Sequence, residues 1–186
     1  VRSLTTQFKW ATCPHILERW LRDMRICGRE SGELESRLST ISPKRGEVLG
    51  GNSEDKTIFL EEREFKRIGA VPEEFIRTIE PLILHERTKA RLKEGIVLLH
   101  DDDFQWFARY GLPVNARNVL DKNKKSMNLW YEETIPPDTL LYALLFEKGE
   151  GELFGSVKKV FERRPYLQVG GDETVGMGWC AIRLVE

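Results

Sequence analysis

The sequence is short of cysteine and of long hydrophobic runs. Its three cysteines, Cys13, Cys27 and Cys180, have neither an even count nor the paired spacing of a zinc site, so we interpret each as a small buried hydrophobe and expect no disulfide scaffold. No apolar stretch approaches the roughly 20 residues of a membrane-spanning helix. The first residues also lack the basic start and apolar run of a signal peptide. A cytoplasmic protein is therefore expected.

Net charge is also nearly absent, with 29 Lys and Arg against 30 Asp and Glu. Bulk electrostatics therefore give no reason to expect nucleic acid, and any such partner must use a local basic patch. The 186 residues, 40% of them hydrophobic, predict one domain, 1–186, with a sizeable core. Because the chain opens on Val1 directly in strand-like sequence, we expect that an N-terminal segment is missing.

Hydrophobic periodicity predicts an alternation of strands and helices. The even-numbered residues Leu4, Phe8 and Trp10 share one face of a strand predicted at 2–12. Further strands are predicted at 57–66, 96–99, 139–146, 166–169 and 179–185, and helices at 14–28, 72–81, 104–108 and 153–161. The stretch 139–146 is almost entirely apolar, which is typical of a strand buried on both faces.

Residues 28–56 differ in composition from the rest of the chain. They are rich in Gly, Ser and alternating charge, and Pro43 and several glycines interrupt any hydrophobic period. The stretch is therefore predicted as a mobile insertion with little regular structure, and not as a second domain.

An imidazole and three carboxylates follow the predicted strand at 96–99. His100, Asp101, Asp102 and Asp103 could in principle hold Mg²⁺. Contiguous residues at a strand end point in different directions, however, and seldom enclose an ion. We therefore interpret the aspartates as capping residues of the helix that follows, and predict no metal site.

A long hairpin with a basic tip is predicted at 112–133. Between Asn115 and Lys125 the chain carries four basic residues against the single acidic Asp121, a net charge of plus three (four minus one). The basic residues are Arg117, Lys122, Lys124 and Lys125. This cluster suits contact with phosphates, although lysines that discourage edge pairing would explain a charged turn equally well.

Two residues on the returning strand of this hairpin could supply an acid or a base. Tyr131 and Glu132 are the candidates. Glutamates beside an aromatic residue are more often a solvent-facing strand edge with a cross-strand pair, so the residues themselves leave this role open.

The segment Gly170–Gly178, GGDETVGMG, places four glycines within nine residues between two predicted strands. Its backbone can adopt positive φ and allow another molecule to approach closely. It is not a Walker loop, because no Gly-Lys-Ser/Thr follows. A ligand-contact loop and a tight packing turn are equally compatible with it.

Several strings occur in one order along the chain: IFLEEREFK, VLLHDDDFQWF, VNARNVLDKNKKSMNLWYEETIPPDTLLYALL and LQVGGDETVGMGWC. In combination they resemble the backbone (fourth) subunit of the Cmr complex, the type III-B CRISPR effector, in the RAMP superfamily. The resemblance implies an α+β, modified ferredoxin-like or RRM-like RAMP fold with a loop-rich insertion. It also implies a protruding β-hairpin called a thumb, which maps onto 112–133 and is wedged into the duplex of guide and target RNA.

The resemblance further implies partners and contact residues. These are guide RNA, target RNA, copies of the same subunit and other Cmr subunits. The residues implied in RNA contact are Asn115, Arg117, Asn118, Lys122, Lys124 and Lys125 on the hairpin, and Gly170, Gly171, Thr174, Gly176 and Gly178 in the glycine-rich loop.

The resemblance implies that the family is catalytic, but it leaves open whether residues of this chain take part in catalysis. Family members cut target RNA at regular intervals with Mg²⁺ or Mn²⁺, through an aspartate in an N-terminal region that has no match here. Tyr131 and Glu132 are then expected only to assist. Two alternatives remain: a RAMP-fold guide-RNA-processing endoribonuclease, and a purely structural interaction module.

Overall fold

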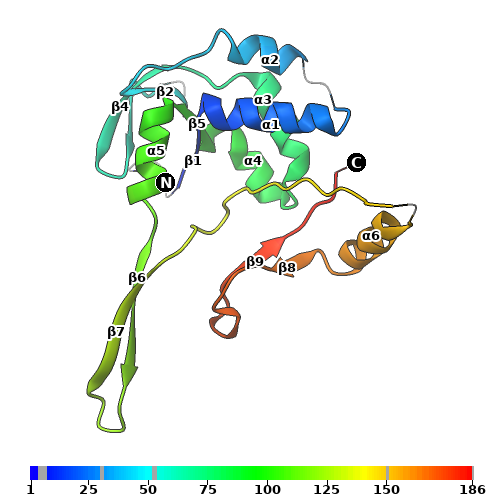
Figure 1. Ribbon diagram of the computed structural model, residues 1–186. Coiled ribbons are helices and arrows are strands. Elements are labelled where there is room, and N and C mark those ends of the chain that lie inside the picture. The colour runs from blue at the N-terminus through cyan, green and yellow to red at the C-terminus, as the bar shows by residue number, and fades with distance from the viewer. Residues whose placement is uncertain (4–7, 30–31, 52–53, 150, 186) are drawn as a thin grey trace. The chain divides into compact units, whose positions relative to one another are not determined.

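The computed structural model describes residues 1–3, 8–29, 32–51, 54–149 and 151–185. They form mixed helices and strands, which confirms the predicted α+β class (Figure 1). Their contacts divide into two compact units, Val1–Pro72 with Lys93–Tyr142, and Glu73–Leu92 with Ala143–Glu186. Each unit is built from two separate stretches of the chain. The single domain predicted for 1–186 stays a prediction.

The first unit contains a five-stranded sheet in the order β1-β5-β2-β4-β3. Its strands are β1 (Trp10–Thr12), β2 (Glu47–Gly50), β3 (Thr57–Leu60), β4 (Arg63–Gly69) and β5 (Ile96–Leu99). β5 runs parallel to β1 and antiparallel to β2, and β2 runs parallel to β4. All four residues of β5 are buried, which confirms the strand predicted from its apolar sequence.

The core of this unit lies between the sheet and α5 (Asp101–Tyr110). Its members are Val48, Ile58, Leu60, Phe65, Val97, Leu99 and Phe107. Each such buried side chain stabilises the fold by about 1.5–3 kcal/mol relative to exposure. The phenyl rings of Phe65 and Phe107 contact one another with centroids 5.8 Å apart, which joins α5 to β4.

The helix predicted from Pro14 is confirmed as α1 (Pro14–Ile26). Proline suits its first turn, where the missing N–H has no partner to lose. Leu17, Trp20 and Leu21 are buried on one face, and Gly28 follows the helix with φ of +73°.

The prediction of little regular structure for 28–56 is wrong at two places. α2 (Gly32–Leu38) buries Leu34 and Leu38, which lie one turn apart, and packs against α1. β2 lies inside the sheet, with Val48 fully buried. In these two short elements, burial of the apolar side chains favours regular structure more than the surrounding glycine, serine and charged residues disfavour it. Mobility of the stretch stays a prediction.

The single long strand predicted at 57–66 is also wrong. β3 and β4 form an antiparallel hairpin in which Ile58 pairs with Phe65 and Leu60 with Arg63. The reversal occurs at Glu61, which takes φ of +51° without being glycine. Because such a turn carries no glycine or proline signal, hydrophobic alternation alone does not reveal it.

The strand predicted at 2–12 is confirmed only as β1, at Trp10–Thr12. Phe8 pairs with Arg2 through an isolated antiparallel bridge, and Leu4 lies outside the described residues. The Phe8 side chain is exposed.

The second unit contains α3 (Glu73–Ile79), the 3-10 turn η1 (Glu80–Leu82) at Pro81, and α6 (Leu153–Arg163). It also contains the strands β8 (Tyr166–Gln168) and β9 (Trp179–Ala181) on either side of the 3-10 turn η2 (Glu173–Val175). α4 (Glu86–Gly95) was not predicted, because charged residues dominate it and Leu92 is its one large buried apolar side chain. Among the described helices, none is long and apolar enough to cross a membrane.

The buried strand predicted at 139–146 is wrong. The segment is extended but pairs with no strand among the described residues, and most of its large side chains are exposed. A strand requires a neighbour to pair with, and sequence composition does not identify that neighbour.

Candidate nucleic-acid interface

The hairpin predicted at 112–133 is present and extends from the first unit's sheet and helices (Figure 1). It consists of β6 (Val114–Leu120) and β7 (Ser126–Glu133), paired antiparallel from Val114 opposite Glu133. The register shifts between Val119 and Leu120. Residues paired directly across the two strands share a face, so the register assigns each predicted contact residue to one side.

One face of the hairpin is largely apolar and uncovered. Val114, Leu129 and Tyr131 lie on it, and the ring-bearing Tyr131 is 69% exposed. The other face carries the polar Arg117 and Glu132, which are only half-exposed. The exposed apolar face of this hairpin is a surface of the kind that binding partners cover.

The polar face is held together by a charged pair. Arg117 donates from Nε to the Glu132 carboxylate at 2.8 Å, and the Trp130 indole donates to the same carboxylate at 2.6 Å. Asn115, on the same face, donates to Thr134 Oγ1. On the apolar face, Asn118 Oδ1 accepts from the Ser126 hydroxyl. Arg117, Asn115 and Asn118 therefore have intramolecular partners as well as being candidates for RNA contact.

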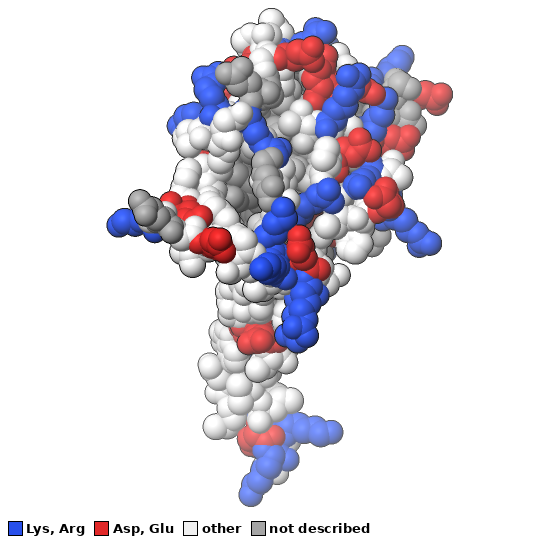
Figure 2. Space-filling view, turned by 90° about the vertical axis from the view of Figure 1, so that its right-hand side faces the viewer, with Lys and Arg blue, Asp and Glu red and all other residues white. Residues whose placement is uncertain are grey.

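The lysines at the tip are positioned by Asp121. Its Oδ1 accepts from the backbone N–H groups of Asn123 and Lys125, each at 2.8 Å, and its own N–H donates to the Lys125 carbonyl. The carboxylate is thus engaged inside the turn, and Lys124 takes φ of +62°. The side chains of Lys122, Lys124 and Lys125 are exposed, and the basic groups at the end of the hairpin are visible in Figure 2.

The two candidate catalytic residues do not come together. Tyr131 and Glu132 are neighbours in β7, so their side chains lie on opposite faces of the ribbon. Glu132 interacts with Arg117 and Trp130, whereas Tyr131 is exposed on the apolar face. No shared acid-base site is formed between them.

The glycine-rich loop connects β8 to β9 in the second unit. Gly170, Gly176 and Gly178 have positive φ, as does the non-glycine Asp172. A Cβ atom on Gly178 would lie 2.1 Å from the Val169 carbonyl oxygen, whereas Gly171 has normal φ and open space around it. Gly178 is therefore required by the turn itself, while Gly171 is free to serve contact with a partner.

Gln168 links the two sides of this loop, and it was not among the residues predicted from the sequence. Its Nε2 lies within 3.1 Å of the Gly170 carbonyl and 3.4 Å of the Met177 carbonyl, on the two sides of the loop. The candidate contact residue Thr174 lies in η2 at the tip of the loop. The sequence does carry a signal for Gln168, because it is a polar residue at the end of a predicted strand and lies two residues before a glycine pair.

The aspartates after β5 make contacts within the first unit. Asp102 interacts with Arg45, and the buried Asp103 accepts from Gly46 N at 2.9 Å and Arg63 Nη2 at 2.8 Å. The predicted capping role is corrected in one respect, because the N-cap of α5 is His100, whose Nδ1 accepts from Asp102 N. Across the described ranges, no group of three or more His, Cys, Asp or Glu side chains is arranged to hold an ion.

Asp101 stabilises the start of a different helix. It accepts from the N–H of His15 in the first turn of α1. Burial, followed by smaller effects that include a hydrogen bond with Asp101, raises the pKa of the Cys13 thiol to about 12.

The interpretation of every cysteine as buried is correct for Cys13 and wrong for Cys27, which is exposed, while Cys180 is half-buried.

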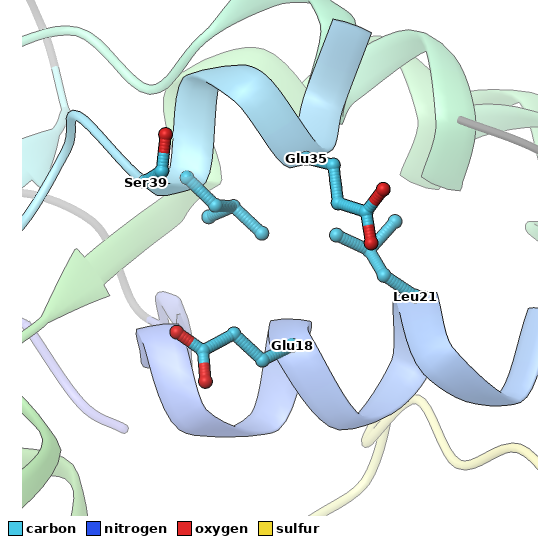
Figure 3. A pocket seen from close by; sticks show the side chains of 5 residues that line it. Glu18, Leu21, Glu35 and Ser39 are labelled. Carbon is cyan, nitrogen blue, oxygen red and sulfur yellow. The ribbon is translucent and has the colours of Figure 1, made fainter. Parts of the chain in front are cut away.

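A small pocket between α1 and α2 adds no further site. Its volume is about 230 Å³, and Figure 3 shows Glu18 and Glu35 on its opposite sides. Leu21, Leu38 and Ser39 complete the lining. Glu35 forms a salt bridge with Arg25, and the pocket is smaller than those that enclose most ligands.

Comparison with known families gives a match over most of the chain. The model of the RAMP superfamily matches residues 15–181. A protein of Pyrococcus furiosus named CRISPR system Cmr endoribonuclease Cmr4 is 29% identical over 196 residues, covering 100% of this chain and 65% of the relative. The chain thus spans slightly less than two thirds of the length of this relative.

Solved structures show the same fold. The crystal structure of oligomeric Cmr4 from Pyrococcus furiosus has a TM-score of 0.68 at 25% identity and covers 96% of this chain and 66% of that one. A chain of the type III-B Cmr-beta complex in its apo state has a TM-score of 0.70 at 20% identity and covers 98% of this chain and 62% of that one. The modified ferredoxin-like RAMP fold is therefore shared with these structures.

Proposed function

The chain belongs to the RAMP superfamily, and from that membership we propose that it is a guide-RNA-binding, self-associating backbone subunit of a type III-B CRISPR ribonucleoprotein in the cytoplasm. Its partners in this proposal are guide RNA, target RNA, copies of itself and other subunits of the complex. The resemblance to the Pyrococcus relative along the whole of this chain supports the assignment.

One observation carries the RNA-binding role. The hairpin presents three exposed lysines around a turn whose only carboxylate, that of Asp121, is engaged by two backbone N–H groups. The tip is therefore a concentrated positive charge on a chain with a formal net charge of −1. Phosphate groups are the partner that such a tip fits.

The apolar face of the hairpin extends this contact. An exposed aromatic ring next to branched apolar side chains can stack on or wedge between bases, which all have a π-face. Tyr131 and Leu129 are placed for this contact. We assign Tyr131 to base contact and Glu132 to positioning Arg117, and both would assist cleavage only indirectly.

The glycine-rich loop is the second proposed RNA contact. The open surroundings of Gly170, Gly171 and Gly176 allow a phosphate backbone to approach the peptide closely. Thr174 adds a hydroxyl at the tip of the loop. The loop then recognises the RNA backbone and not its sequence.

Target cleavage belongs to the intact complex in this proposal. There Mg²⁺ or Mn²⁺ would stabilise the charge that develops on the phosphate. The described residues do not fit such an ion, because the carboxylates of Asp102 and Asp103 are engaged by arginines and no other acidic group is suitably placed. The cutting step is therefore not assigned to these residues.

A charge-reversal experiment tests the RNA-binding role. Lys122, Lys124 and Lys125 are changed together to Glu, and affinity for single-stranded RNA is measured from 50 to about 300 mM salt. We expect weaker binding and a slope of log affinity against log salt that is shallower by about 2, because each phosphate contact contributes about 0.7.

The matched control changes three exposed lysines outside the hairpin, Lys44, Lys56 and Lys66, to Glu. This variant has the same net charge as the hairpin variant. We expect the hairpin variant to lose clearly more affinity and slope than the control. Equal losses in the two variants would contradict the proposal, since they would reflect net charge alone.

A further inference from the structure

The outward face of α5 carries two exposed aromatic rings, which we call the aromatic platform. They belong to Trp106 and Tyr110, one helical turn apart, and their centroids are separated by 5.7 Å at an interplanar angle of 50°. Trp106 is 38% exposed and Tyr110 is 63% exposed. The other side of the same helix buries Asp103 and Phe107 against the core.

The platform is held in place from the side of the sheet. The Arg63 guanidinium lies 5.0 Å from the centroid of the Trp106 ring and forms a salt bridge with the buried Asp103 carboxylate at 2.8 Å. The ring of Phe107 meets Trp106 edge-on, with centroids 5.2 Å apart. A cation near an indole and an edge-to-face ring pair both favour one ring orientation. An exposed ring with a fixed orientation loses less entropy when a ligand stacks on it.

The surroundings of the platform are polar. Arg109 lies three residues after Trp106 and next to Tyr110, its side chain is exposed, and among the described residues it forms no ion pair. One turn before Trp106, the Asp102 carboxylate is engaged by Arg45. A nucleotide matches this combination, because its base has a π-face for the rings and its phosphate has a negative charge for the arginine.

The platform is continuous with the hairpin that we propose to bind RNA. α5 ends at Tyr110 and β6 begins at Val114, and Figure 1 shows the helix leading directly into the strand. The four residue steps between them span at most about 14 Å. Val114 is itself exposed on the apolar face of the hairpin. An RNA strand that passes the base of the hairpin is therefore within reach of the platform.

We propose that the aromatic platform stacks one unpaired base of the bound RNA. The base covers the ring of Tyr110, Trp106 supports that ring, and Arg109 contacts the adjoining phosphate. Arg63 acts through Trp106 and is a positioning residue. This inference rests on the proposed function and adds to it a base-stacking site on α5, outside the hairpin and the glycine-rich loop. Since every base has a π-face, the site does not select a sequence.

Removal of one ring tests the inference. Tyr110→Ala and Tyr110→Phe are made in the 186-residue chain, and fluorescence anisotropy measures affinity for a single-stranded RNA of about 12 nucleotides. We expect Tyr110→Ala to bind about tenfold more weakly, and Tyr110→Phe, which keeps a ring, to bind within about twofold of the unchanged chain. The slope of log affinity against log salt should stay the same in both variants, because neither removes a phosphate contact.

Two controls make the test specific for stacking. Phe146→Ala removes a ring that is 65% exposed and lies outside the platform, so it should leave RNA affinity unchanged. An abasic oligonucleotide of the same length keeps the phosphates without the bases, and Tyr110→Ala should bind it as tightly as the unchanged chain does. Circular dichroism checks that both variants remain folded, which the exposure of the two rings predicts.

Several results would overturn the inference. They are an unchanged RNA affinity of Tyr110→Ala, an equal loss in Tyr110→Phe or in Phe146→Ala, and an equal loss with the abasic oligonucleotide. Weaker self-association of Tyr110→Ala in sedimentation equilibrium, with unchanged RNA affinity, would instead identify the platform as a protein interface.

Failure of this inference is distinguishable from failure of the proposed function. The hairpin lysines are tested through the salt slope, which Tyr110→Ala should not alter. A hairpin variant that loses affinity and slope while Tyr110→Ala loses nothing would overturn the platform alone. An unchanged chain without measurable affinity for RNA would contradict the proposed function itself.

Discussion

Asp103 connects α5 to the sheet of the first unit through its buried carboxylate. Its side chain is 5% exposed and interacts with Arg63, whose guanidinium lies 5.0 to 5.8 Å from the rings of Trp106, Phe65 and Phe107. It also accepts from the backbone of Gly46, just before β2. One carboxylate therefore joins α5, β4 and the start of β2.

This arrangement gives a prediction with an internal control. Asp103→Ala should lower the free energy of unfolding by about 2–3 kcal/mol, because it leaves the partly buried donors of Arg63 and Gly46 without their charged acceptor. Asp102→Ala removes the neighbouring pair with Arg45, which is exposed, and should cost less than about 1 kcal/mol. Urea denaturation of the two variants measures the difference, and equal costs would contradict the role given to Asp103.

The glycines of the 170–178 loop give a second residue-scale prediction. Gly178→Val should disturb the β8–β9 pairing, because valine resists φ of +75° and would meet the Val169 carbonyl. Gly171→Val has open space and normal φ, so it should keep the β8–β9 structure and lower RNA affinity several-fold. Amide chemical shifts of β8 and RNA titrations measure both effects. Unchanged affinity in Gly171→Val would mean that the loop is only a packing turn.

Among the elements, those defined by local pattern were predictable from the sequence. α1, β5 and the hairpin β6–β7 follow from periodicity and from capping or turn residues. The β3–β4 turn was missed because Glu61 adopts positive φ without a glycine. The strand predicted at 139–146 was wrong because an apolar run does not by itself supply the neighbouring strand that pairing requires. The roles of His100 as a helix cap and of Gln168 in the loop were missed, since both depend on side-chain hydrogen bonds to backbone groups that only the folded geometry defines.

The hairpin tip yields a prediction at the scale of the element. Asp121→Ala and Asp121→Asn remove the same charge, but only Asn keeps an oxygen that can accept from the Asn123 and Lys125 N–H groups. We expect faster amide exchange at these two positions and weaker RNA binding in the Ala variant than in the Asn variant. Identical behaviour of the two would show that tip geometry does not contribute to binding.

At the scale of the whole molecule, the proposed function separates binding from cutting. The features that we propose for RNA binding are surface features of this chain: the basic tip, the apolar hairpin face and the glycine-rich loop. The described residues bring no ion-binding cluster to these surfaces. In the proposed function this chain holds and shapes RNA, and cleavage belongs to the complete assembly.

The most direct measurement is photo-crosslinking of the chain to single-stranded RNA that contains 4-thiouridine, followed by mass spectrometry of the attached peptides. The account predicts crosslinks concentrated in two peptides, one spanning the hairpin at 112–133 and one spanning the loop at 170–178. They should fall together as salt is raised. Crosslinks that avoid both peptides and lie on the surfaces of α1 and α2 would contradict the account.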